Sequence, residues 1–220
     1  GNDRSYQLTF FIFCLQFCKL HRCLSKPLTF LNLTHRFKTP TCLSGSILLS
    51  HPTLVDPNFF KSILFISAHS DDHGTLGVIL NRPLGQTLGE LDSSFQHKNF
   101  AEVPVFEGGP VETEKLIIAA WEWLDSPTSF KLYFGIDLEK AESLRVENSS
   151  IEIACFLGHS GWSPGQLEDE LKEDAWLVSS LDYKLFSKMK EKKKIWRKTV
   201  GSINDDLRLQ ADCPENPSDN

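Results

Sequence analysis

Short apolar runs separated by turn residues make up most of the chain from Gly45 onward. The runs at 46–50 and 62–68 are short and continuous, which is typical of strands buried on both faces. A polar stretch at 69–73 separates the second run from a third at 74–80. Because two apolar runs joined by a polar turn are the signal of a hairpin, we predict a β-hairpin there.

Alternating apolar and polar positions predict three further strands, at 115–124, 130–134 and 151–157. Successive side chains of a strand point to opposite faces, so each of these segments presents one apolar face to a core. The side chains assigned to those faces are Ile117, Ala119, Trp121, Trp123, Phe130, Leu132, Phe134, Ile151, Ile153, Cys155 and Leu157.

Capping residues predict short helices between the strands. Thr87 and Ser163 each begin a capping-box pattern, in which Glu or Gln follows three residues later. Asp56 precedes a proline, and Asp137 precedes a segment with an apolar stripe. The spacing of helices and strands is too irregular for a repeated parallel crossover unit, and it therefore predicts an α+β fold.

Charge divides the chain into unlike parts. Residues 1–43 carry a balance of +5 and the remainder carries −11, within a total of −6. We expect 1–43 to be a poorly structured basic leader, with a targeting segment as the less favoured alternative. A single domain is expected over 44–204, followed by a disordered acidic tail over 205–220. No apolar run reaches 18 residues, so no transmembrane segment is expected.

Three motifs follow one another along this domain. The first spans 56–83 and ends in Asn81-Arg82-Pro83, after His69 and the pair Gly74-x2-Gly77. The second is Glu107-Gly108-Gly109-Pro110-Val111, and the third runs from Gly158 to Glu168 as GHSGWSPGQLE. In order and spacing they closely resemble the motifs of the bacterial YqgE/AlgH family.

The resemblance implies a compact cytoplasmic domain whose bifurcated, mixed but largely antiparallel sheet forms a partial barrel with short flanking helices. It implies no established catalytic activity and no cofactor, and one branch of the family carries the label of a transcriptional regulator. His159 departs from the family, in which tyrosine is common at this position.

The polar and glycine-rich residues of the motifs fall at strand ends, where ligands are often held. The planar fork of Arg82 suits a carboxylate or phosphate, and paired glycines let a backbone approach a ligand. Each feature also has a structural interpretation, as an internal ion pair or as a turn with positive φ. The expected ligand-binding residues are Asn81, Arg82, Gly108, Gly109, Trp162, Gln166 and Glu168.

One compact group of possible metal ligands lies in the predicted hairpin turn. His69, Asp71 and His73 are the residue types of a zinc or iron site. A polar turn whose histidines point to solvent is the favoured interpretation. Elsewhere, the spacing around Ser160 does not fit the G-x-S-x-G nucleophile pattern, and Cys155 is expected to be an inert core thiol.

A basic run at 184–198 contains eight basic residues against one acidic residue. It predicts a weak interaction surface for nucleic acid, anionic lipid or an acidic protein. Direct DNA binding is disfavoured, because a domain at −11 opposes the phosphate backbone. The residues assigned to this surface are Lys188, Lys192, Lys193, Lys194 and Arg197.

These observations favour a non-catalytic protein that binds a small molecule or a protein partner, or that has a regulatory role. One alternative is a transcription-linked interaction module that uses the basic C-terminal helix. Another is a hydrolytic or metal-dependent enzyme centred on His69.

Overall fold

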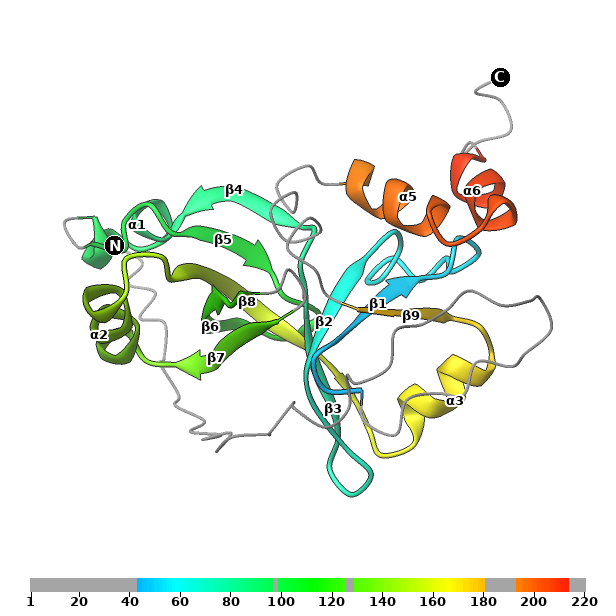
Figure 1. Ribbon diagram of the computed structural model, residues 1–220, viewed down its shortest axis with the longest axis horizontal. Helices are drawn as coiled ribbons and strands as arrows, with labels where there is room; N and C mark the ends of the chain where they lie inside the picture. The colour runs from blue at the N-terminus through cyan, green and yellow to red at the C-terminus, as the bar shows by residue number, and fades with distance from the viewer. Residues whose placement is uncertain (1–42, 97–98, 126–128, 181–192, 214–220) are drawn as a thin grey trace.

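The computed structural model describes residues 43–96, 99–125, 129–180 and 193–213. In these ranges the chain forms an α+β domain with nine strands and five short helices (Figure 1). The strands are β1 Ser46–Ser50, β2 Ile63–Ser70, β3 Gly74–Ile79, β4 Pro83–Thr87, β5 Pro104–Glu107, β6 Val111–Trp123, β7 Phe130–Ile136, β8 Glu152–Trp162 and β9 Trp176–Ser180. The helices are α1 Leu88–Leu91, α2 Leu138–Glu147, α3 Gln166–Lys172, α5 Lys193–Gly201 and α6 Asp205–Asp212, with a 3-10 turn at Ser93–Phe95.

The sheet divides at β8. The first part of β8 pairs antiparallel with β6 and parallel with β5, whereas its end, from Ser160 to Trp162, pairs antiparallel with β3. From β3 the sheet continues through β2 and β1 to β9, while β5 leads to β4 and β6 carries β7. The sheet is therefore bifurcated, mixed and largely antiparallel, and it does not close (Figure 1). The predicted fold class is confirmed.

Three glycines allow two backbones to cross closely at this division. A Cβ atom on Gly158, which has φ +70°, would lie 2.6 Å from the carbonyl oxygen of Gly109. A Cβ atom on Gly108 would lie 2.2 Å from the carbonyl oxygen of Gly158, and Gly109 itself has φ +149°. Only residues without a side chain fit such contacts. The paired glycines therefore give close access to the backbone of β8, where the sequence predicted a ligand.

Apolar side chains on both faces of the sheet form three clusters. The first lies between β1–β3 and β6–β8 and is closed by α5 and α6, with the fully buried Trp196 donating its indole N–H to the Ser50 carbonyl at 3.0 Å. The second lies between β5, β6 and β8 and the helices α1 and α2. The third lies between β1–β3 and α3 and contains Trp162 and Trp176.

Most locally predicted elements are confirmed. The predicted hairpin is β2–β3, in which His69 pairs with Thr75. The alternating segments form β6, β7 and β8, and their predicted apolar faces lie in or against the first two clusters. Asp137 caps α2 by accepting from the Lys140 N–H at 2.7 Å. The helix predicted after Asp56 is not present, because residues 57–61 form turns.

The expectation of a disordered tail from residue 205 is wrong for its first eight residues, which form α6. Asn204 caps this helix by accepting from the Leu207 N–H at 2.7 Å. Leu207 and Ala211 are one helical turn apart and both are buried in the first cluster. Two apolar residues at this spacing anchor a segment whose composition is otherwise polar.

The remaining predictions about the chain ends concern residues outside the described ranges, apart from Leu43, which is buried, and Cys213, which is exposed. The division of the chain at 44 and 204 stays a prediction. Among the described residues, no helix has the length and apolar character needed to cross a membrane.

Replacing Leu207 by alanine tests the docking of α6. Leu207 is 7% exposed and Leu209, on the same helix, is 66% exposed. We expect Leu207→Ala to lower the free energy of unfolding by about 2 kcal/mol, because it removes buried apolar contacts. Urea unfolding followed by tryptophan fluorescence measures the change, and Leu209→Ala is the matched control, expected within about 0.5 kcal/mol of the parent. Equal losses for the two variants would contradict the packing of α6.

Candidate functional site

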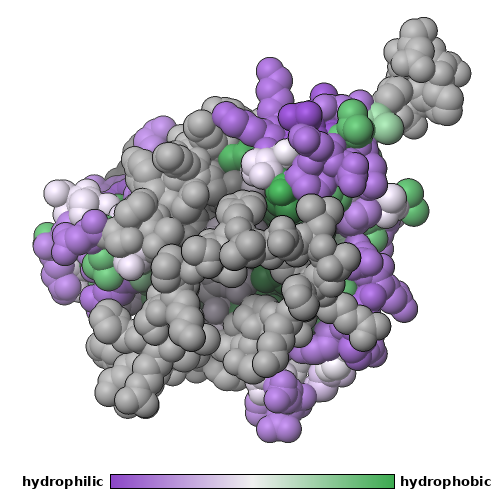
Figure 2. All heavy atoms as spheres, turned by 45° about the vertical axis from the view of Figure 1, so that its right-hand side comes forward, coloured by the Kyte–Doolittle hydropathy of each residue, from purple (hydrophilic) through white to green (hydrophobic). Residues whose placement is uncertain are grey.

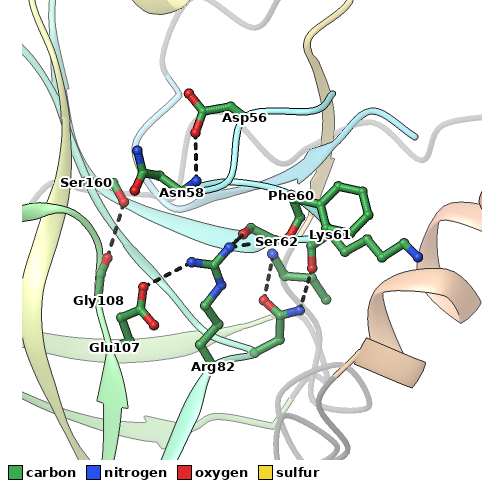
Figure 3. Close-up of polar contacts among 11 residues, drawn as sticks. Asp56, Asn58, Phe60, Lys61, Ser62, Arg82, Glu107, Gly108 and Ser160 are labelled. Carbon is green, nitrogen blue, oxygen red and sulfur yellow. Dashed lines mark hydrogen bonds and ion pairs between the residues drawn. The ribbon is translucent and has the colours of Figure 1, made fainter. Parts of the chain in front are cut away.

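Arg82 and Asn81 hold the segment 60–63, which leads into β2. The Arg82 guanidinium donates to Glu107 Oε1 at 3.0 Å, to Ser62 Oγ at 3.0 Å and to the Phe60 carbonyl at 3.3 Å (Figure 3). The ion pair with Glu107 matches the other interpretation of Arg82 given above, in which it pairs with a carboxylate of the same domain. Asn81 is 4% exposed, and its side chain accepts from the Ile63 N–H at 2.8 Å and donates to the Lys61 carbonyl at 2.9 Å.

The hydroxyl of Ser160 is used in the same region. It is fully buried and donates to the Gly108 carbonyl at 3.2 Å (Figure 3). That carbonyl also accepts from the Ile79 N–H at 2.9 Å. Gly108 therefore links β8 and β3 at the division of the sheet, and Ser160 is not placed as an exposed nucleophile.

A second set of polar contacts lies at the start of α3. Glu170 accepts from the indole N–H of Trp162 at 2.9 Å and from that of Trp176 at 2.7 Å. Gln166 donates to the other carboxylate oxygen of Glu170 at 2.9 Å. Glu170 thus joins the end of β8, the helix and the start of β9. Sequence reasoning did not single out Glu170, and its i, i+4 spacing from Gln166 was the available signal.

The helix begins later than the sequence predicted. The cap of α3 is Gly165, with φ +79°, rather than Ser163. Half of the predicted capping box is present, because the Ser163 N–H donates to Gln166 Oε1 at 3.1 Å. Leu167 is fully buried in the third cluster, and Leu171, one helical turn later, packs against the same cluster.

A third set of polar side chains gathers where the β2–β3 hairpin meets α3. His69 Nε2 lies 3.4 Å from Glu168 Oε1, and His69 Nδ1 lies 2.8 Å from Thr75 Oγ1. One ligand atom from each of His69, Asp71 and Glu168 lies within 4.8 Å of the other two. The structure therefore combines two residues of the predicted metal group with one residue of the predicted ligand-binding group. His73 is exposed and is not part of this set.

The long-range partner of His69 could not be read from the sequence. His69 and Glu168 come together because β3 pairs with the end of β8, which places Thr75 opposite Trp162. A Cβ atom on Gly74 would lie 2.1 Å from the Trp162 carbonyl oxygen, so the hairpin turn and the segment entering α3 are in direct contact. Neither motif carries a local signal of that pairing.

His159 lies on β8 beside an irregularity in β6. Its Nδ1 is 3.6 Å from Glu112 Oε2, an oxygen that also lies 3.0 Å from Lys115 Nζ. Burial lowers the pKa of His159 and Lys115 lowers it further, while Glu112 acts in the opposite direction. Glu112 has φ +48°, in the left-handed region that non-glycine residues rarely adopt.

The Cys155 thiol is buried and is not placed to react. It is 1% exposed within the second cluster, and burial raises its pKa to about 12. A thiol with such a pKa is not a thiolate near neutral pH, so the expectation of an inert core cysteine agrees with its surroundings.

An apolar hollow is lined by side chains of the two branches of the sheet, and none of the polar groups described above lines it. Its lining is entirely apolar or aromatic and contains none of the predicted ligand-binding residues. It comes from β2, β3, β6, β7 and β8, with Phe65, Val78, Trp121, Leu132 and Phe156 among its members.

The predicted basic surface is only partly within the described residues. Lys188 and Lys192 lie outside them, and Lys193 is the first residue of α5. Lys194 and Arg197 are exposed on α5, and Arg197 Nε lies 3.4 Å from Asp212 Oδ1. Hydrophilic side chains gather over the corner formed by α5 and α6 (Figure 2).

Replacing Glu170 by alanine tests the contacts between α3 and the two tryptophans. Trp162 and Trp176 would each lose the acceptor of a buried indole N–H, and an unsatisfied buried donor costs about 1–3 kcal/mol. We expect the free energy of unfolding to fall by about 2 kcal/mol in urea titrations. Glu173→Ala, at an exposed position after the same helix, is the control and is expected to change little. Identical stabilities of the two variants would contradict this assignment.

Comparison with solved structures supports the fold. The solution structure of the AlgH protein from Pseudomonas aeruginosa matches with a TM-score of 0.56 at 22% identity, over 83% of this chain and all of that one. The crystal structure of protein DIP2367 from Corynebacterium diphtheriae matches with a TM-score of 0.58 at 20% identity, over 78% of this chain and 92% of that one.

Sequence comparison finds relatives with a higher identity than these two solved structures. A UPF0301 protein of Streptomyces coelicolor is 32% identical over 186 residues, which cover 80% of this chain and 94% of the relative. A UPF0301 protein of Azoarcus is 34% identical over 159 residues, which cover 69% of this chain and 79% of the relative. The family described as AlgH-like matches residues 47–208, which contain all three motifs. The resemblance inferred from those motifs is thereby confirmed, and the chain belongs to the AlgH-like family.

Proposed function

We propose that the protein is a non-catalytic binding protein whose receptive surface is the junction of the β2–β3 turn with α3. The observation that supports this most strongly is the convergence of His69, Asp71 and Glu168, whose ligand atoms lie within 4.8 Å of one another. Asp71 is exposed and Glu168 is half-exposed, so a small ligand can reach the group from solvent.

The contacts of the predicted ligand-binding residues reduce the number that we assign to the receptive surface. Asn81 and Arg82 use their polar atoms to hold the segment that leads into β2, and Gly108 and Gly109 contact the β8 backbone. Gln166 and Trp162 bond to Glu170. Of the predicted ligand-binding residues, Glu168 is the one whose side chain faces His69, so it is the member that we retain in the receptive surface.

The case against catalysis rests on the nucleophile candidates. The Cys155 thiol is buried with a pKa raised to about 12, and the Ser160 hydroxyl is buried and bonded to Gly108. The Ser160 hydroxyl donates to a backbone carbonyl and the Cys155 pKa is raised, whereas an activated nucleophile needs a neighbouring base or a lowered pKa. We also propose a regulatory role, since binding of a small ligand is the simplest input to a regulator. A cytoplasmic location is part of the same proposal.

Native mass spectrometry of the full chain tests the proposal. The chain would be purified without chelators and without metal-affinity resin, so that a bound ligand is neither stripped nor introduced. We expect an additional non-covalent mass on the wild type and its loss from His69→Ala and Glu168→Gln. His73→Ala is the matched control, because His73 is an exposed histidine close to the same turn but outside the converging group.

Two results would contradict the proposal. One is a wild-type chain that carries no additional mass, and the other is a mass that persists unchanged in both variants. Circular dichroism of each variant shows whether the fold is retained, so that loss of ligand is not confused with loss of structure.

A further inference from the structure

The junction of the β2–β3 turn with α3 has the make-up of a metal site. An imidazole nitrogen from His69 and carboxylate oxygens from Asp71 and Glu168 converge from two elements that are far apart in the sequence. These are ligand types that Zn²⁺ accepts, in a coordination that is usually tetrahedral. The two carboxylates also supply negative charge at the place where a cation would sit.

The His69 ring is held in one orientation. Its side chain is 8% exposed, and Nδ1 lies 2.8 Å from the hydroxyl oxygen of Thr75, its cross-strand partner. When the hydrogen is on Nδ1, it is donated to Thr75, and the Nε2 lone pair then faces Glu168. A histidine that binds a metal commonly has its other ring nitrogen bonded in this way, which fixes both tautomer and direction.

The distance between His69 Nε2 and Glu168 Oε1 is one that a single shared ion can bridge. His69 Nε2 and Glu168 Oε1 are 3.4 Å apart. A charge-assisted hydrogen bond between such atoms is about 2.7–2.9 Å long. Two ligands of a tetrahedral Zn²⁺ with bonds of about 2.1 Å lie about 3.4 Å apart. Asp71 lies on the exposed turn with a carboxylate oxygen within 4.8 Å of a ligand atom of each of the other two residues, and rotation of its exposed side chain would bring it to the same ion as a third group.

We propose that His69, Asp71 and Glu168 bind one divalent transition-metal ion of the Zn²⁺ class, with Thr75 as the residue that positions His69. This rests on the proposed function, since it names the ligand of the same surface. An imidazole among the ligands favours Zn²⁺ over Mg²⁺ and Ca²⁺, which prefer oxygen ligands alone.

Titration calorimetry with ZnCl₂ alone as the probe tests the metal site. The full chain is first treated with iodoacetamide, because exposed cysteines such as Cys213 would otherwise compete for Zn²⁺. Cys155 is buried and is expected to stay unmodified. The wild type is expected to bind one Zn²⁺ per chain, with weaker or no response to MgCl₂.

Matched pairs of variants locate the ion. We expect His69→Ala, Asp71→Asn and Glu168→Gln each to weaken Zn²⁺ binding at least tenfold. The neighbouring changes His73→Ala, Asp72→Asn and Glu173→Gln are expected to leave it unchanged. Thr75→Val keeps the shape of the side chain without the hydroxyl, and it is expected to weaken binding about 10- to 100-fold.

The opposite results would overturn the metal assignment. Absence of stoichiometric Zn²⁺ binding, or equal binding by His69→Ala and His73→Ala, would leave only an ion pair between His69 and Glu168. If Zn²⁺ fails to bind while native mass spectrometry still shows an adduct that depends on His69, the metal assignment falls and the proposed function stands. If no adduct of either kind is found, both fall.

Discussion

The close crossing of two backbones at Gly158 is the contact on which the rest of the fold depends. Gly108 and Gly109 lie against β8 where that strand leaves β6 and β5 and turns to pair with β3. A side chain at any of the three positions would overlap backbone atoms of the other segment, and a backbone cannot move aside as a flexible side chain can. The bifurcation of the sheet is the consequence.

The position of the candidate site follows from this crossing. Because the end of β8 pairs with β3, the chain enters α3 directly beside the β2–β3 turn, where Gly74 touches the Trp162 carbonyl. Glu170 then fastens α3 to Trp162 and Trp176, so Glu168 is held in front of His69. Many motif residues thus serve the scaffold, and the proposed receptive surface retains only Glu168 among the predicted ligand-binding residues.

The sequence predicted what depends on neighbours along the chain. The alternation at 115–124 and the cap at Asp137 require only local chemistry, and both are confirmed. The tail was misjudged because its acidic composition concealed Leu207 and Ala211, whose burial depends on a distant cluster. The link between His69 and Glu168 was missed for the same reason, since it arises from the pairing of β3 with the distant end of β8 and neither motif contains it.

Comparing two glycine-to-alanine variants tests the importance of the crossing most directly. Gly158 and Gly165 have similar positive φ values of +70° and +79°, but only Gly158 has backbone atoms where a Cβ would lie. Alanine in this region costs about 1–2 kcal/mol at either position, so the difference between the variants isolates the steric contact. We predict that Gly158→Ala lowers the free energy of unfolding, measured in urea, by at least about 2 kcal/mol more than Gly165→Ala does. Equal losses would contradict the account.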